Sequence, residues 1–307
     1  MVTLSAWVNS WIERRSIRLA TQTISGYRTI HRKYIESSSV GQILIGDLTP
    51  EDLIVLLSPI LALGYSRQAQ LTQILINAAL KDATRRRIIP WNPMESVDRI
   101  HHRRRETAWL STDEAGKLLK CAKDCGDPYY IAWILGFCCG LRRGELLGLK
   151  WSDIDFTASV MQIRRQRIRV EGKILETPPK SDSSIRDIPL SDFVVDALRD
   201  VRRIGAEYVV ERDGKAATDK MLEAALDAAI DRAEVRRITL HGMRHTMAAT
   251  AATTGIPIKT LQSILGHAQY TTTADIYAHV DRAAVISAAQ AITDATIMGI
   301  GARLEIA

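Results

Sequence analysis

The sequence of 307 residues lacks the marks of a secreted, disulfide-stabilised or membrane-spanning protein. Its four cysteines lie between Cys121 and Cys139 without a Cys-x-x-Cys pair, which argues against a zinc ribbon or a disulfide framework and favours a reducing compartment, the cytoplasm. The longest apolar run, residues 129–141, is shorter than the roughly 20 residues that cross a bilayer, so we expect a buried helix there. The N-terminus has no basic segment before an apolar core, and no secretory signal is expected.

Positive and negative charges are nearly balanced, but the small surplus is unevenly placed. The chain holds 41 Lys and Arg against 35 Asp and Glu. Residues 1–105 carry 15 basic and 8 acidic side chains, whereas residues 106–307 carry 26 and 27. Because the whole surplus of positive charge lies in the first third, it indicates a module that binds nucleic acid, followed by a nearly neutral domain. An ordinary solvated basic face is the alternative.

The first third has the pattern of a small helical bundle. Apolar residues recur at helical spacing over residues 4–12 and 24–35. Thr49, followed by Pro50 and by a carboxylate three residues on, predicts another helix start. A fourth helix is expected over residues 66–88, ended by the Pro-Trp-Asn-Pro tetrapeptide that follows.

A basic segment separates this bundle from the rest of the chain. Residues 98–108 are polar and lack periodicity, as in an interdomain linker that could lie along a phosphate backbone or be a solvated tether. A capping signal around Thr112 opens a second unit. We therefore expect a helical domain at 1–97, a linker at 98–108, a larger domain at 109–282 and a C-terminal helix or tail at 283–307.

The second unit is expected to be helical with one strand-rich insertion, which makes the whole chain mainly α with a small antiparallel β insertion (α+β). No internal repeat is evident. The expected strands cover residues 160–170, 174–177 and 185–190, and the expected helices cover residues 129–140, 143–149, 191–203, 219–234, 241–253 and 257–265.

Several polar clusters in this unit are ambiguous when taken singly. Arg142 could be a helix-start cation paired with Glu145, and Lys180 an ordinary exposed lysine. His241 and His245 are four residues apart, as in the zinc motif His-Glu-x-x-His, but the glutamate that serves as the base there is missing. The pattern of a third ligand is missing too, so no metal site is expected.

Taken together and in order, these clusters resemble the motifs of the tyrosine recombinase (phage integrase) family. The resemblance runs from about residue 110 to residue 280 and includes Trp-Ser-Asp-Ile-Asp-Phe and Arg-Asp-Ile-Pro-Leu. It implies a helical core-DNA-binding domain followed by a tyrosine-recombinase catalytic domain. The matching motifs are Gly140-Leu141-Arg142-x-x-Glu145-Leu146, Lys180, His241-x-x-Arg244-His245-Thr246, Leu265-Gly266-His267 and Tyr277-Ala-His-Val.

The residue types fit phosphoryl transfer on DNA, because this reaction places negative charge on a pentacoordinate phosphorus and depends on positioning and electrostatic stabilisation. Guanidinium forks hold phosphate oxygens in a fixed geometry, and a tyrosine can keep the bond as a phosphotyrosine. The resemblance implies no metal and no cofactor. It implies that Tyr277 is the nucleophile, which joins a 3′-phosphate and leaves a 5′-hydroxyl. Arg142 and Arg244 would bind the phosphate, and Lys180 would be the general acid. His241 would assist proton transfer, His267 would donate a hydrogen bond, and Glu145 would support these groups.

Two of these assignments have rivals in the sequence. Tyr270 is near the site, but it lies only three residues after His267, in an expected turn, so Tyr277 is preferred. Lys173 competes with Lys180, which is preferred because it precedes the Arg-Asp-Ile-Pro-Leu strand, as the family lysine does.

The resemblance also implies roles for the basic residues of the first third and for the C-terminal tail. In this family the two domains clamp duplex DNA at recombination sites, four protomers assemble on synapsed DNA, and an accessory directionality factor can take part. The tail, with an apolar helical face over residues 285–295, would dock on a neighbouring protomer or pack within its own chain. Because the chain begins with the basic module, no arm-binding domain is expected before it. The expected DNA contacts are Arg28, Arg32, Lys33, Arg67, Lys81, Arg85, Arg86, Arg87, Arg103, Arg104 and Arg105.

The sequence therefore predicts a site-specific DNA recombinase or integrase of a mobile element such as a phage, located in the cytoplasm with the nucleoid. A type IB topoisomerase-like or telomere-resolving strand transferase is one alternative. A DNA-binding protein with silent chemistry is another, although the full set of six catalytic residue types argues against it.

Overall fold

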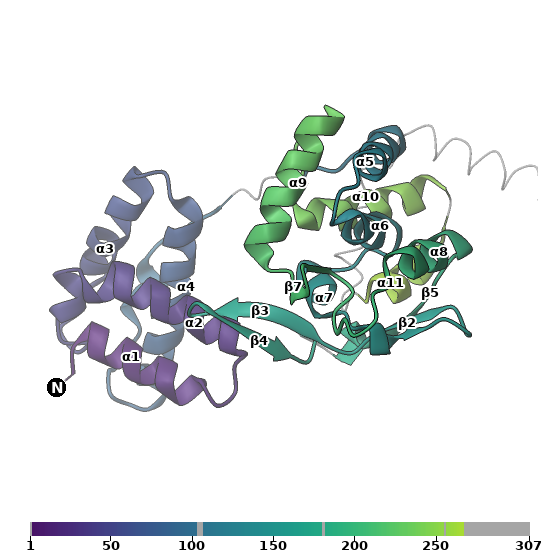
Figure 1. The fold of residues 1–307 in the computed structure, drawn as a ribbon. Helices are drawn as coiled ribbons and strands as arrows, with labels where there is room; N and C mark the ends of the chain where they lie inside the picture. The colour runs from purple at the N-terminus through teal and green to yellow at the C-terminus, as the bar shows by residue number, and fades with distance from the viewer. Residues whose placement is uncertain (1, 103–106, 180–181, 255, 267–307) are drawn as a thin grey trace, which may run out of the picture. The chain divides into compact units, whose positions relative to one another are not determined.

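The computed structural model describes residues 2–102, 107–179, 182–254 and 256–266 (Figure 1). The chain divides into two compact units: residues 1–105 with 170–173, and the remainder. The boundary after residue 105 falls within the predicted linker. Among the described residues, no helix is both long and apolar enough to cross a membrane.

The first unit is the helical bundle expected from the sequence. Thr49 and Asp52 cap the third helix reciprocally: the Thr49 hydroxyl accepts from the Asp52 N–H at 3.2 Å, and the Asp52 carboxylate accepts from the Thr49 N–H at 2.9 Å. Apolar side chains from all four helices form one buried core. The helices are α1 (Leu4–Arg15), α2 (Thr21–Ile30), which continues into a π-helical turn (His31–Glu36), α3 (Pro50–Ala62) and α4 (Ser66–Arg85), followed by a 3₁₀ turn (Pro93–Ser96).

The second unit is built around one buried helix. α6 (Tyr130–Cys138) covers most of the apolar run singled out in the sequence, and Trp133, Ile134 and Leu135 on it are fully buried. It packs against α5, α8 and α10. The other helices of this unit are α5 (Thr112–Asp124), α7 (Arg143–Gly148), α8 (Asp192–Val201), α9 (Asp219–Ala233), α10 (Leu240–Thr253) and α11 (Ile258–Leu265).

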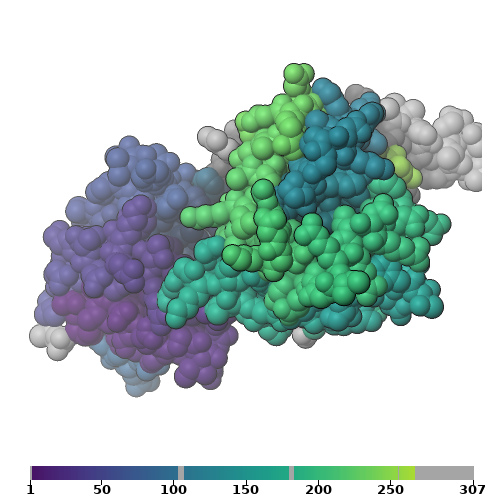
Figure 2. Space-filling model, viewed as in Figure 1, coloured from purple at the N-terminus to yellow at the C-terminus, as the bar shows by residue number. Residues whose placement is uncertain are grey.

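Local signals explain where two of these helices run. α5 begins at Thr112, where the sequence placed its capping signal, and Ser111 and Glu114 form the capping pair. α9 begins after Thr218, whose hydroxyl accepts from the Met221 N–H. α5 and α9 pack side by side, and their blue and green surfaces adjoin in Figure 2.

In the part of the chain that the structure describes, the strands form three small antiparallel sheets. The largest has the order β1–β2–β5, with Met161 opposite Ile188 and Ile163 opposite Arg186. In the β3–β4 hairpin, Glu171 and Gly172 occupy the expected turn with positive φ values of 48° and 82°. The strands are β1 (Ile154–Asp155), β2 (Val160–Ile163), β3 (Gln166–Val170), β4 (Lys173–Thr177), β5 (Arg186–Pro189), β6 (Glu211–Arg212) and β7 (Lys215–Ala216).

Candidate active site

Arg142 stands at the start of a helix. After α6, Gly140 takes a left-handed conformation (φ 63°), and the chain then enters α7 with Arg142 as its N-cap residue. Glu145, in the first turn of α7, accepts from the Arg142 backbone N–H at 2.9 Å and from its Nη1 at 2.7 Å. The three-residue spacing of the motif therefore closes the helix start and holds the arginine against its carboxylate.

Arg244 reaches the same place from α10. It is only 2% exposed, and its Nη1 donates to the Gly140 carbonyl at 2.7 Å while its Nη2 donates to the Leu265 carbonyl. A Cβ on Gly140 would lie 2.8 Å from Cδ2 of Leu265. Both the left-handed backbone conformation and this close approach favour glycine at position 140.

A third arginine, which the sequence reasoning did not single out, completes the cluster. Arg186 on β5 donates from Nη1 and Nη2 to the two carboxylate oxygens of Glu145, at 3.0 and 2.9 Å. Both side chains are buried, 6% and 2% exposed. Arg186 shares the inward face of β5 with Ile188. The sequence did contain a signal for Arg186: side chains alternate along a strand, so the arginine of Arg-Asp-Ile-Pro-Leu lies on the same face as the core isoleucine two residues later.

The C-terminal end of α11 binds all three arginines. Arg142 Nη2 donates to the Gly266 carbonyl at 2.8 Å, and Arg186 Nε donates to the Ile264 carbonyl at 2.7 Å. With the Leu265 carbonyl bound by Arg244, three successive carbonyls of one helix end accept hydrogen bonds from three guanidinium groups. These carbonyls are the partly negative end of the helix, so they stabilise the neighbouring cations.

Burial and charge shift the pKa values in this cluster. Burial of the Glu145 carboxylate works to raise its pKa, but the hydrogen bonds and charge of Arg186 and then the charge of Arg142 outweigh it and lower the pKa to about 2. Burial, followed by the positive charge of Arg142, lowers the pKa of Arg244 to about 9 against the opposing effect of Glu145. Glu145 and Arg244 are therefore both charged at neutral pH.

Two histidines of the motif lie on α10. His241 is exposed in its first turn, whereas His245 is half-buried, and their rings pack edge to face with centroids 4.7 Å apart. Thr246, the last residue of the motif, accepts a hydrogen bond from the Leu110 backbone N–H at 3.0 Å. The motif thus combines one buried arginine with an exposed histidine and a threonine that ties α10 to the chain before α5.

Three of the predicted catalytic residues, Lys180, His267 and Tyr277, lie outside the described residues, as do the rival Tyr270 and the predicted tail at 283–307. The structure therefore brings Arg142, Glu145 and Arg244 together and adds Arg186.

The predicted DNA contacts of the first unit differ in their exposure and in the ion pairs that they form within the protein. Arg32, Lys33, Arg67, Lys81, Arg85, Arg86 and Arg87 are exposed, Arg28 is half-buried, and Arg103, Arg104 and Arg105 lie outside the described residues. Arg28 pairs with Glu13 at 3.0 Å. Arg85 and Arg86 pair with the buried Asp82 at 2.5 and 2.8 Å.

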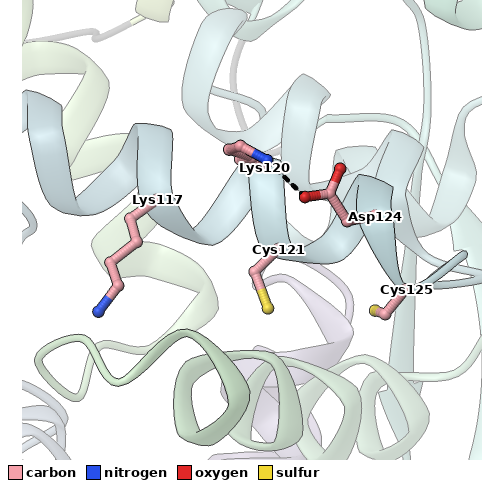
Figure 3. Close-up of a pocket in the computed structure, with 5 residues that line it drawn as sticks. All are labelled: Lys117, Lys120, Cys121, Asp124 and Cys125. Carbon is pink, nitrogen blue, oxygen red and sulfur yellow. Dashed lines mark hydrogen bonds and ion pairs between the residues drawn. The ribbon is translucent and has the colours of Figure 1, made fainter.

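A pocket of about 400 Å³ lies elsewhere in the second unit, on α5 (Figure 3). Lys117, Lys120, Cys121, Asp124 and Cys125 line it, and Lys120 pairs with Asp124 at 2.6 Å. It contains none of the residues of the arginine cluster.

The sequence of the second unit matches a known family. The model of the phage integrase family matches residues 108–284, which is more than half of the chain. The chain belongs to the phage integrase family. Within it, the tyrosine recombinase XerC-like protein of Caldanaerobacter subterraneus subsp. tengcongensis is 30% identical over 219 residues, which are 63% of this chain and 54% of that protein. The chain therefore spans about half the length of this relative.

Solved structures of integrases share the fold. The Tn1549 transposon integrase in complex with a circular intermediate DNA has a TM-score of 0.79 at 22% identity, over 94% of this chain and 99% of that one. A lambda integrase tetramer bound to a Holliday junction has a TM-score of 0.70 at 18% identity, over 90% of this chain and 77% of that one. The predicted fold, mainly α with small antiparallel sheets and a tyrosine-recombinase catalytic domain, is confirmed.

Proposed function

We propose that this phage integrase family member is a site-specific DNA recombinase that cleaves and rejoins DNA through a covalent 3′-phosphotyrosyl intermediate and integrates or excises a mobile element. The observation that carries the proposal is the convergence of Arg142 and Arg244, both in the positions of the family motif, on the end of α11. The next residue along the chain is His267, and Tyr277 follows ten residues later.

Two converging guanidinium groups suit a phosphodiester undergoing substitution. Each can direct N–H donors at a non-bridging oxygen, and their charges are fixed before the reaction begins. Within the described residues, Arg142 donates to the Glu145 carboxylate, the Ser184 hydroxyl and the Gly266 carbonyl, and Arg244 donates to the Gly140 and Leu265 carbonyls. These contacts use only some of the five N–H donors that a guanidinium carries. Both residues can therefore stay anchored to the protein while they bind phosphate.

The remaining steps are assigned by family motif. The Tyr277 oxygen attacks phosphorus and forms the phosphotyrosyl bond while the bond to the 5′-oxygen breaks, and Lys180 gives that oxygen a proton. His241 assists proton transfer and His267 donates to a non-bridging oxygen. Reversal by the 5′-hydroxyl of another strand rejoins the DNA, so the bond energy is kept without ATP, a metal or a cofactor.

The partner of this activity is double-stranded DNA carrying recombination sites, bound in the cytoplasm. Both integrase structures above contain DNA, and the lambda integrase structure is a tetramer. We infer the same assembly for this chain, with the tail at 283–307 docked on a neighbouring protomer and an accessory factor setting the direction. Deletion of 283–307 should then weaken synapsis while single-site binding persists. Unchanged tetramer formation on DNA would contradict the docking.

The nucleophile can be tested with DNA that flanks the gene. Duplexes tiled across this DNA, each with one nick, trap the intermediate because the short strand beside the nick diffuses away after cleavage. Denaturing gels should show a protein–DNA adduct with the wild type and with the control Tyr270→Phe, but none with Tyr277→Phe. An adduct that survives Tyr277→Phe would refute the assignment.

The same reagents separate the alternative functions. Relaxation of supercoiled plasmids without any specific site would favour a type IB topoisomerase-like enzyme. Sequence-specific binding without an adduct on any tiled duplex would favour a DNA-binding protein with silent chemistry.

A further inference from the structure

Arg186 makes more contacts than a simple ion pair requires. Besides its two bonds to Glu145, its Nη1 donates to the Ser184 carbonyl at 3.0 Å and its Nε donates to the Ile264 carbonyl at 2.7 Å. One side chain from β5 thus joins the segment before the strand, the first turn of α7 and the last turn of α11. A planar guanidinium can hold three such directions at once, whereas an ammonium group has no fixed fork.

The Glu145 carboxylate transmits this geometry to Arg142. Its Oε1 accepts from Arg186 Nη1 and from Arg142 Nη1, and its Oε2 accepts from Arg186 Nη2 and from the Arg142 backbone N–H. Because the fork of Arg186 fixes the plane of the carboxylate, it also fixes the direction from which Glu145 binds the Arg142 guanidinium.

The same side chain packs against the turn that ends α11. Gly266 is left-handed (φ 63°), and a Cβ there would lie 3.0 Å from Cδ of Arg186 and 2.9 Å from the Ser183 carbonyl oxygen. The backbone of Gly266 therefore lies directly against Arg186. A shift of the Arg186 side chain would therefore disturb the Gly266 backbone, whose carbonyl binds Arg142.

From these contacts we propose that Arg186 is a positioning residue for strand cleavage. Through Glu145 it orients Arg142, and through Ile264 it holds the end of α11, whose next two carbonyls bind Arg244 and Arg142. The inference deepens the proposed function and rests on it. It adds one residue that holds the two proposed phosphate clamps, Arg142 and Arg244, in a fixed position relative to each other.

A purely stabilising role makes a different prediction. A buried ion pair contributes little net stability compared with well-packed apolar residues, so stability alone does not require an arginine at this position. If Arg186 acts through the fixed directions of its guanidinium hydrogen bonds, Arg186→Lys should keep the positive charge but lose these directions. Arg186→Met should lose both the charge and the hydrogen bonds. The matched control is Arg164→Gln, which removes a half-exposed pair with Asp187 and a 3.4 Å hydrogen bond to the Arg186 backbone carbonyl but leaves every contact of the Arg186 guanidinium in place.

The first measurement is the single-turnover rate of adduct formation on the nicked duplex that the wild type cleaves. We expect a fall on the order of 10- to 100-fold for Arg186→Lys and a larger one for Arg186→Met, with duplex binding within about threefold of the wild type. Arg164→Gln should cleave at the wild-type rate.

The second measurement is the pH dependence of that rate. Among the described residues, the charged groups that face Glu145 are Arg142 at the start of α7, Arg186 on β5 and Arg244 on α10, while α11 contributes carbonyls. Arg186→Met removes the strongest charged partner, so burial raises the pKa of Glu145. The rate of this variant should fall at acidic pH, because Glu145 becomes protonated. In the wild type Glu145 stays ionised over the same range, so its protonation does not change the wild-type rate.

The third measurement needs no DNA. Backbone amides of residues 258–266 should exchange with deuterium several-fold faster in Arg186→Met than in the wild type or in Arg164→Gln. Failure of the wild type to form any adduct would refute the proposed function, and the exchange rates would still decide whether Arg186 fixes α11.

Wild-type cleavage by Arg186→Lys and Arg186→Met would overturn the inference. So would unchanged amide exchange, or a loss of rate that matches a loss of duplex binding. Failure of both variants to fold, shown by the absence of a thermal transition, would also overturn it, because Arg186 would then serve the fold itself.

Discussion

Replacing Glu145 by glutamine tests whether one carboxylate holds the arginine cluster together. The change is nearly isosteric but removes the negative charge that Arg142 and Arg186 share. The drop in the Glu145 pKa from 4.5 to about 2 corresponds to about 3 kcal/mol of stability at neutral pH, at about 1.4 kcal/mol per unit. Breaking buried ion pairs costs a similar amount, about 3–5 kcal/mol.

The assay is calorimetric unfolding of the full chain. At pH 7 we expect Glu145→Gln to lower the melting temperature of the catalytic unit by roughly 6–12 °C. The matched control is Glu223→Gln, which breaks the half-exposed pair with Arg143 and should cost less than about 1 kcal/mol.

The pH dependence gives the sharper check. Because the folded-state pKa of Glu145 is depressed, its stabilisation is complete above pH 4.5 and is lost as the pH falls toward 2. The difference between the wild type and Glu145→Gln should therefore shrink over this range. A difference below about 1 kcal/mol at pH 7, or one that stays constant down to pH 3, would refute the reasoning.

Three further outcomes are expected. Gly266→Ala should lower the free energy of unfolding by about 1–3 kcal/mol, because position 266 has a positive φ and a Cβ would meet the Ser183 carbonyl oxygen at 2.9 Å; calorimetry measures it, and an unchanged melting temperature would contradict it. Arg244→Lys should slow adduct formation on the order of 100-fold or more with little change in duplex binding, and an unaffected rate would show that Arg244 is not a phosphate clamp. Arg32→Gln should reduce the slope of log binding constant against log salt concentration for duplex DNA by about 1. Arg85→Gln should reduce this slope less, because Arg85 already pairs with Asp82. Equal reductions by the two variants would contradict this ranking.

Local signals in the sequence predicted most of the elements of this fold. The capping pair of Thr49 and Asp52, and the turn at Glu171 and Gly172, depend on residues within three positions of each other. Such patterns can be recognised without knowing the rest of the chain. The start of α5 at Thr112 was likewise predicted from a local capping signal, and Ser111 is its N-cap residue.

The candidate site was predictable only where a family motif marked it. Arg142, Glu145 and Arg244 were found by motif, and the structure shows why their spacing matters. Arg186 was not found, because its role depends on Glu145, 41 residues earlier, and on Ile264, 78 residues later. The carbonyl contacts with α11 have no sequence signature at all, since every residue has a carbonyl.

Charge balance explains why such a cluster suits an anionic substrate. Among the described residues, Arg142, Arg186 and Arg244 share the single carboxylate of Glu145, and the carbonyls at the end of α11 offset the rest of the positive charge with dipoles. The pKa of Arg244 falls to about 9, first through burial and then through the positive charge of the neighbouring Arg142. A phosphodiester bound there would supply the missing negative charge and raise that pKa again. The charge that develops on phosphorus during cleavage would be stabilised further by cations that are already in place, which is the condition for electrostatic catalysis without reorganisation.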